Sequence, residues 1–156
     1  MSYVKQGNFL DFFVPVMAVA GNATKPLATI DIGAASADHG EYVCVRPCFV
    51  NRIQAAVTIE AVSGTVTAPT VIYTKRSAYG VSSGEAVIGT LTLPSGTAIG
   101  KTVYKDITPV QFAVGEIIEL SHTVGSGTPT GMVNADIIAE FDPEVAANNS
   151  NMIESV

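Results

Sequence analysis

Hydrophobic and polar residues alternate along most of this chain with a period of two, which is typical of β-strands with one buried face. The clearest run covers residues 53–61, where the polar positions are Gln54, Thr58 and Glu60. The opposite positions are all apolar and predict one buried face: Ile53, Ala55, Val57, Ile59 and Ala61. Residues 132–141 repeat the pattern, with Val133, Ala135, Ile137, Ala139 and Phe141 on the predicted buried face.

Other runs are rich in β-branched residues, which favour pleated strands. They predict strands at residues 27–32, 41–46, 70–75, 85–93, 101–106, 110–114 and 116–122. Gly, Ser, Asn and Pro separate these runs and predict turns at residues 21–22, 63–64, 82–84, 94–96 and 125–129. Roughly eight to ten short strands with this spacing predict an all-β fold. We expect an antiparallel β-sandwich, jelly-roll-like, with extended N- and C-terminal segments, and a closed barrel is the less favoured alternative.

Three segments follow from this pattern. Residues 27–142 are predicted to form the β-sandwich domain, residues 1–26 an N-terminal strand or arm, and residues 143–156 a C-terminal arm or tail. The apolar run 9–20 has some features of a signal peptide, but Asp11 and Pro15 interrupt it. No run approaches the roughly 20 apolar residues of a transmembrane helix, so we expect no membrane partner.

The last residues have no period that would build a core of their own. We therefore expect one or both ends to lie as arms across neighbouring subunits, and unchanged assembly after deletion of residues 143–156 would contradict this. Two isoleucines, Ile88 and Ile138, interrupt otherwise polar strand faces. The candidate interface residues are Phe9, Phe12, Phe13, Ile88, Ile138, Met152 and Ile153.

The composition favours an oligomer and argues against nucleic-acid binding. Charged residues make up 14% of the chain, against about 25% in ordinary soluble domains, and the mean hydropathy is +0.37. A chain with so few charges is expected to bury apolar surface against neighbours. The net charge of −6 and the absence of Trp remove the basic patches and the best stacking platforms that nucleic acids require.

Several short motifs resemble catalytic or metal-binding sites, but ordinary strands and loops explain them better. Gly80, Ser82 and Gly84 match the G-x-S-x-G nucleophile elbow, but the following segment alternates like a strand where the elbow requires a helix. The carboxylates of the late strands could form a glycosidase pair, but solvated strand faces are the better explanation for them: Glu119, Asp136 and Glu140. Three further carboxylates lack the loop pattern of a calcium site: Asp31, Asp38 and Glu41.

The chain contains only two cysteines and two histidines. Cys44 and Cys48 are predicted to be buried thiols, with a disulfide across a turn at Pro47, or a zinc site with His39, as alternatives. His39 and His122 are far apart in sequence and are expected to be surface or hydrogen-bonded residues. Asn22 and Asn148 begin formal glycosylation sites, for which chance is the default explanation. We expect no catalytic residue, no cofactor and no metal, and hence no enzyme.

The segment Ile107–Leu120 is followed by a Gly- and Thr-rich loop and a terminal strand that ends in Asp142-Pro143. This arrangement resembles the closing strands of the β-sandwich proteins that decorate or cement tailed-bacteriophage capsids. The resemblance implies a homo-oligomer, most often a trimer, that binds adjacent major capsid subunits on the virion surface after assembly in the host cytoplasm. The alternative is a carbohydrate- or receptor-binding β-sandwich module of a tail fibre or adhesin, and binding on a glycan array would favour it.

Overall fold

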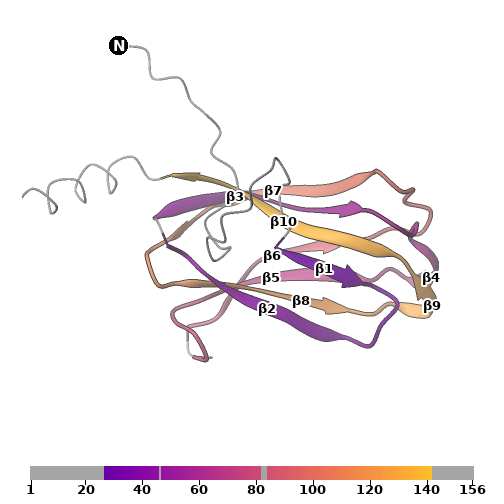
Figure 1. Ribbon diagram of the computed structural model, residues 1–156, viewed down its shortest axis with the longest axis horizontal. Coiled ribbons are helices and arrows are strands. Elements are labelled where there is room, and N and C mark those ends of the chain that lie inside the picture. Colours follow the sequence, from indigo (N-terminus) through magenta and orange to yellow (C-terminus); the bar gives the residue numbers. More distant parts are fainter. Residues whose placement is uncertain (1–26, 46, 82–83, 142–156) are drawn as a thin grey trace, which may run out of the picture.

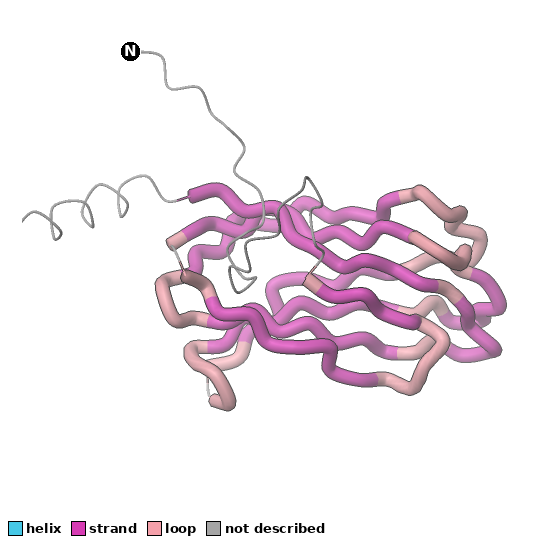
Figure 2. The backbone as a smooth tube through the Cα atoms, in the orientation of Figure 1, coloured by secondary structure: helices cyan, strands magenta, loops and turns pink. Residues whose placement is uncertain are grey.

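The computed structural model describes residues 27–45, 47–81 and 84–141, and these form ten β-strands (Figures 1 and 2). The strands are β1 (Ala28–Asp31), β2 (Ala37–Val43), β3 (Cys48–Val57), β4 (Ser63–Thr67), β5 (Thr70–Arg76), β6 (Ala86–Thr92), β7 (Thr102–Phe112), β8 (Ile117–Thr123), β9 (Ser126–Thr130) and β10 (Met132–Phe141). The candidate residues Phe9, Phe12, Phe13, Met152 and Ile153 lie outside the described residues, as do the two proposed arms.

Eight of the strands form two four-stranded antiparallel sheets packed face to face. Sheet 1 has the order β1-β10-β3-β7 and sheet 2 the order β2-β8-β5-β6. The chain crosses repeatedly between the sheets, so that β10 lies between β1 and β3 while β8 lies between β2 and β5. This order is that of a jelly roll. The prediction of an antiparallel, jelly-roll β-sandwich is therefore confirmed.

Alternating side chains of both sheets fill the space between them. Ile30, Val50, Ile53, Val133 and Ile137 of sheet 1 meet Val71, Tyr73, Leu91, Ile118 and Leu120 of sheet 2, and all ten side chains are buried. A fully buried aliphatic side chain contributes roughly 1.5–3 kcal/mol relative to an exposed one. The core therefore supplies a large stabilising term without any crosslink.

Tyr73 joins the two sheets through its hydroxyl group. Its ring is fully buried among the side chains of sheet 2, and its hydroxyl donates a hydrogen bond to the carbonyl oxygen of Gln54 in sheet 1, at 2.7 Å. Burial raises the pKa of this phenol, so the hydroxyl keeps the proton that it donates. The contact fixes the distance and register between β5 and β3.

Two details of the predicted strands were wrong. The run from Ile53 does not continue to Ala61, because β3 ends at Val57 and the chain bends there. Ile59, predicted to be buried, is 77% exposed, while Val62 after the bend returns to the core. Residues 101–106 and 110–114 were predicted as two strands, but one strand, β7, covers most of both.

The segments predicted as turns at residues 63–64 and 125–129 belong instead to a two-stranded ribbon of β4 and β9. Most side chains of the ribbon are exposed, so no hydrophobic alternation marks it in the sequence. Gly64 has a φ of +68°, and a Cβ at this position would lie 2.1 Å from the carbonyl oxygen of Thr128. The glycine that suggested a turn is what allows the two strands of the ribbon to approach each other.

Within the described part of the chain, no helix has the length and apolar character needed to span a membrane.

Candidate functional site

One end of the sandwich carries three exposed valines on two loops that lie side by side. Val43 ends β2, Val45 follows it in the β2–β3 loop, and Val114 lies in the β7–β8 loop. Backbone hydrogen bonds between Cys44 and Gly115, and between Cys44 and Glu116, hold the two loops side by side. The valines are 41%, 47% and 59% exposed in chain order. We call this group, Val43, Val45 and Val114, the valine patch.

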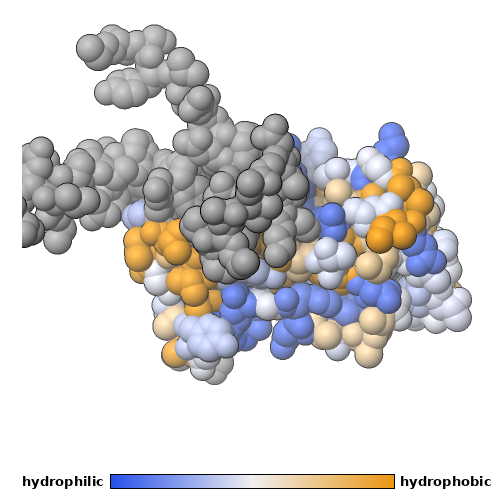
Figure 3. Space-filling view, in the orientation of Figure 1, coloured by the Kyte–Doolittle hydropathy of each residue, from blue (hydrophilic) through white to orange (hydrophobic). Residues whose placement is uncertain are grey.

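The valine patch lies at the end of the molecule where β10 also finishes, because Phe141 is the register partner of Cys48. In the space-filling view, apolar residues gather at this left-hand end (Figure 3). Single exposed hydrophobic residues are normal, whereas adjacent ones are typical of contact surfaces.

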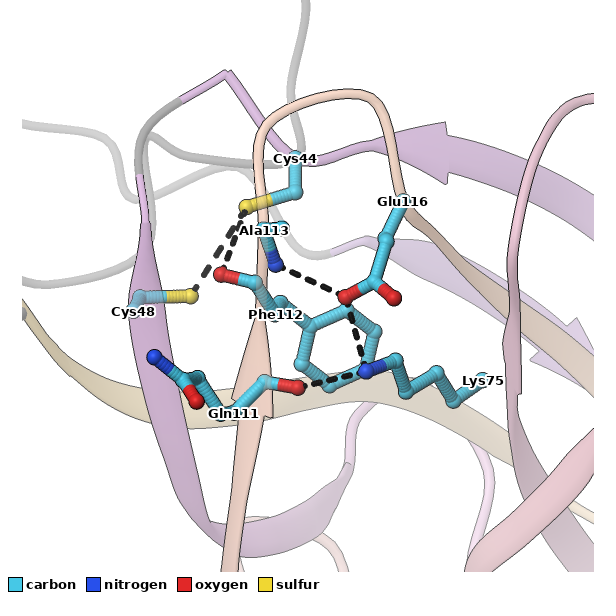
Figure 4. A network of polar contacts seen from close by, with 7 residues as sticks. All are labelled: Cys44, Cys48, Lys75, Gln111, Phe112, Ala113 and Glu116. Atoms are coloured by element: carbon cyan, nitrogen blue, oxygen red, sulfur yellow. Dashed lines mark hydrogen bonds and ion pairs between the residues drawn. The ribbon is translucent and has the colours of Figure 1, made fainter.

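A polar network fastens the β7–β8 loop, which carries Val114 of the patch (Figure 4). Lys75 of β5 lies 2.7 Å from the Glu116 carboxylate and donates a hydrogen bond to the Gln111 carbonyl, also at 2.7 Å. Glu116 in turn accepts a hydrogen bond from the backbone N–H of Ala113. The Lys75 ammonium also lies 5.1 Å from the centre of the Phe112 ring. These contacts give the patch a fixed shape, which reduces the entropy lost when a partner binds.

Cys44 and Cys48 lie directly under the same loops. Both side chains are fully buried, as predicted, and their sulfur atoms are 4.0 Å apart as two thiols that share a hydrogen bond and are not joined by a disulfide. The hydrogen bond with Cys44, followed by burial, raises the pKa of Cys48. Both cysteines therefore act as small apolar side chains in this core rather than as reactive thiolates.

Of the candidate interface residues, Ile88 and Ile138 lie among those described, and their surroundings differ. Ile138 occupies an outward position of β10, next to the buried Ile137, as predicted. Ile88 was assigned to the polar face of its strand, but it is half-buried and packs against the core. The exposed apolar residue of β6 is its neighbour Val87, which is 63% exposed. The irregular pairing of β6 with β5 between Tyr73 and Thr74 explains the changed alternation.

An ion-pair cluster occupies the outer face of sheet 2. The guanidinium of Arg76 lies 2.6 Å from Glu41, 2.9 Å from Glu85 and 2.7 Å from Glu119. Glu41 and Glu119 are direct register partners on β2 and β8, where two like charges repel each other. Burial raises the pKa of Glu119, and the charge of Arg76 opposes that rise. Glu119 was predicted to be solvated, but it is buried, and Arg76 is the cation that makes this burial tolerable.

The two histidines meet although they are far apart in sequence. His39 Nε2 lies 2.6 Å from Nδ1 of the buried His122, whose own Nε2 lies 3.3 Å from the Ala34 carbonyl oxygen. Because a carbonyl only accepts hydrogen bonds, His122 carries its proton on Nε2 and accepts one from His39. Burial, followed by the charge of His122, lowers the pKa of His39, while Asp38 opposes this. The hydrogen bond between the two rings therefore joins β2 to β8.

The remaining candidate chemistry does not converge on one place. Ser82 lies outside the described residues, and a strand, β6, follows its loop where a nucleophile elbow needs a helix. Asp136 lies on sheet 1 and Glu119 on sheet 2, and the side chain of Glu140 is outside the described set. Asp31 accepts a hydrogen bond from the N–H of Gly33. Among the described residues, no group of three or more His, Cys, Asp or Glu side chains is arranged to hold a metal ion.

Comparison of the chain with protein-family models, with curated proteins and with solved structures gave no match.

The sequence analysis did not identify the valine patch, although the sequence contains a signal for it. Val43, Cys44 and Val45 are three consecutive apolar residues, so they place apolar side chains on both faces of an extended chain. With Cys44 in the core, both valines must face outward. The neighbouring Val114 has no such signal, because its contact with the β2–β3 loop arises from the pairing of β2 with β8.

Proposed function

We propose that this protein is a structural subunit of a virus particle, a decoration protein that binds adjacent major capsid subunits of a tailed phage as a homotrimer. The rigid valine patch is the observation that carries this proposal. Its three side chains form an apolar surface on fixed loops, which is the form of a contact site for another protein chain. The low charge content of the chain supports the same conclusion.

The fold is compatible with this function. Jelly rolls occur in viral capsid proteins and also in lectins, and one fold supports many functions. The ionisable residues described above support a structural role, because they pair strands with one another. Arg76 links β5 to β2 and β8, Lys75 fixes the β7–β8 loop, and the histidines join β2 to β8. We therefore infer that the protein acts by binding, without catalysing a reaction.

Binding of this kind draws its free energy from buried apolar area, at about 25 cal/mol per Å². One patch of three valines gives a modest contact. Repetition of the contact in every subunit of a trimer, and of the trimer over a capsid, multiplies its effect through avidity.

The replacement Val45→Asp is expected to weaken self-association at least about 100-fold, because an unpaired carboxylate would have to be buried in the contact. Sedimentation velocity over a range of protein concentrations measures this. The control is Val66→Asp, since Val66 is 86% exposed in the ribbon at the opposite end of the molecule. Equal association of both variants and the wild type would show that the valine patch is not the contact.

Binding to the capsid is tested by co-sedimentation with empty capsids assembled from the major capsid protein of the same virus. The wild-type chain is expected to co-sediment and to saturate at a fixed number of copies per capsid. A protein that stays in the supernatant at all concentrations would contradict the decoration function, even if it forms a trimer.

A further inference from the structure

Three neighbouring strands of sheet 1 lose their regular pairing at the same level. Between β10 and β3 the register shifts at Ile138 and Ala139, and between β3 and β7 it shifts at Val50 and Arg52. Both register shifts fall at Asn51 of β3, the strand between β10 and β7. Bulges of this kind redirect side chains and are frequent beside functional sites. Their coincidence on adjacent strands disturbs the outer face of the sheet at one place.

A shallow depression lies at that place, with a volume of about 420 Å³. Its lining residues come from the three irregular strands: Asn51, Arg52, Asp106, Ile107 and Ile138. Arg52 donates its Nε–H to Asp106 Oδ1 at 2.6 Å across the β3–β7 pair. The depression thus combines an amide, a guanidinium and a carboxylate with the side chain of Ile138, while the side chain of Ile107 packs against the core.

An aromatic ring lies next to this group. Tyr104 is two residues before Asp106 on β7 and is 57% exposed. The guanidinium carbon of Arg52 lies 4.4 Å from the centre of its ring, so the cation holds the ring in place. The hydroxyl of Tyr104 adds a group that both donates and accepts hydrogen bonds.

The charges of the depression select the chemical class of its ligand. Asp106 neutralises Arg52, so a small anion gains little net attraction there. The carboxylate accepts hydrogen bonds, the guanidinium donates them, and the amide of Asn51 does both. A sugar presents hydroxyl groups that match both kinds of partner and a face of C–H groups that packs on Ile138 or Tyr104. We propose that this depression binds a neutral sugar residue of a glycan.

The proposed site is open, so a single copy binds weakly. A monosaccharide of about 12 heavy atoms at about 0.3 kcal/mol per atom gives a dissociation constant in the millimolar range. Several copies on one assembly bind a multivalent glycan surface far more tightly, without any new contact. This gain in affinity rests on the proposed oligomer, whereas binding to the single site does not.

A glycan array probed with the labelled full-length chain identifies the preferred sugar. Titration of the ¹⁵N-labelled protein with that sugar is expected to shift the amide signals of Asn51, Arg52 and Asp106. Asp106→Ala is expected to weaken binding at least about tenfold, which corresponds to the loss of one good hydrogen bond. Thr102→Ala changes an exposed residue of the same strand, outside the depression, and is the matched control that keeps binding.

Three results would overturn the proposal. The first is the absence of binding on the array together with unshifted amide signals at about 100 mM glucose, galactose, mannose and N-acetylglucosamine. The second is sugar binding that Asp106→Ala leaves unchanged. The third is inorganic phosphate shifting the same signals at lower concentrations than any sugar. The mass of the assembly and its response to Val45→Asp do not depend on Asp106. These measurements therefore test the proposed capsid function independently of the proposed sugar site.

Discussion

Replacement of Asp136 by asparagine is expected to stabilise the protein by about 2–4 kcal/mol at about pH 8 and to change little at about pH 3. Asp136 is half-buried on the central strand β10 and accepts a hydrogen bond from the N–H of Ile137 at 3.0 Å. Burial raises the pKa of its carboxyl group from 3.8 to about 7, and the hydrogen bond offsets only part of that rise. The folded protein therefore carries an unfavourable charge at neutral pH.

The direction of the pH dependence follows from the raised pKa. The folded state holds the proton of Asp136 more tightly than the unfolded chain, so this group stabilises the fold most at low pH. That contribution is lost as the pH rises from about 4 to about 7. Asparagine keeps the shape and the acceptor oxygen but carries no charge, so the Asp136→Asn variant lacks this loss.

Urea unfolding at a series of pH values measures the effect of Asp136→Asn. Asp106→Asn is the control, because it removes an exposed carboxylate from the same face of sheet 1. We expect the free energy of unfolding of the control variant to fall between the two pH values by as much as that of the wild type. Equal stability of wild type and Asp136→Asn at about pH 8 would mean that Asp136 is not buried as a charge.

Replacement of Arg76 by glutamine is expected to cost about 3 kcal/mol at neutral pH, because it leaves buried carboxylates without their cation. Glu41 and Glu119 remain opposite each other, with side chains that are 16% and 10% exposed. Lowering the pH to about 4 is expected to recover much of the loss, since protonation removes the repulsion. Denaturant unfolding at both pH values measures the two effects.

A second substitution tests the cause of this loss. Glu119→Gln in the Arg76→Gln background is expected to restore part of the stability, which a double-mutant cycle quantifies. Arg52→Gln is the matched control, because the Arg52–Asp106 pair is 35% and 67% exposed and such pairs contribute little. A loss for Arg52→Gln as large as that for Arg76→Gln would show that burial of the cluster is not the reason.

Most of the fold was predictable because the core strands carry a strong signal. In β10 every second side chain from Val133 to Ala139 is buried, and in β5 and β8 the predicted strands match those observed. The ribbon of β4 and β9 was missed because its residues are polar and mostly exposed, so they lack periodicity. The orientation of Ile88 was not predictable from the sequence, because the irregular pairing of β6 with β5 changes which residues of β6 face the core.

The candidate sites were harder to predict, because each depends on contacts between distant segments. The approach of His39 to His122, and of Arg76 to Glu41, follows from the pairing of β2 and β5 with β8. Local sequence determines that Glu119 occupies a strand, but not that a guanidinium lies 2.7 Å from it. Among the described residues, the valine patch and the depression beside Asn51 are equally products of the strand order.

The mass of the purified full-length chain in solution, measured by sedimentation equilibrium, is the most direct test of the account. A subunit that contacts its neighbours through the valine patch is expected to form a trimer, with three times the chain mass of 16.2 kDa. A mass of one chain, unchanged up to the highest soluble concentration, would contradict the proposal that this jelly roll is built to assemble.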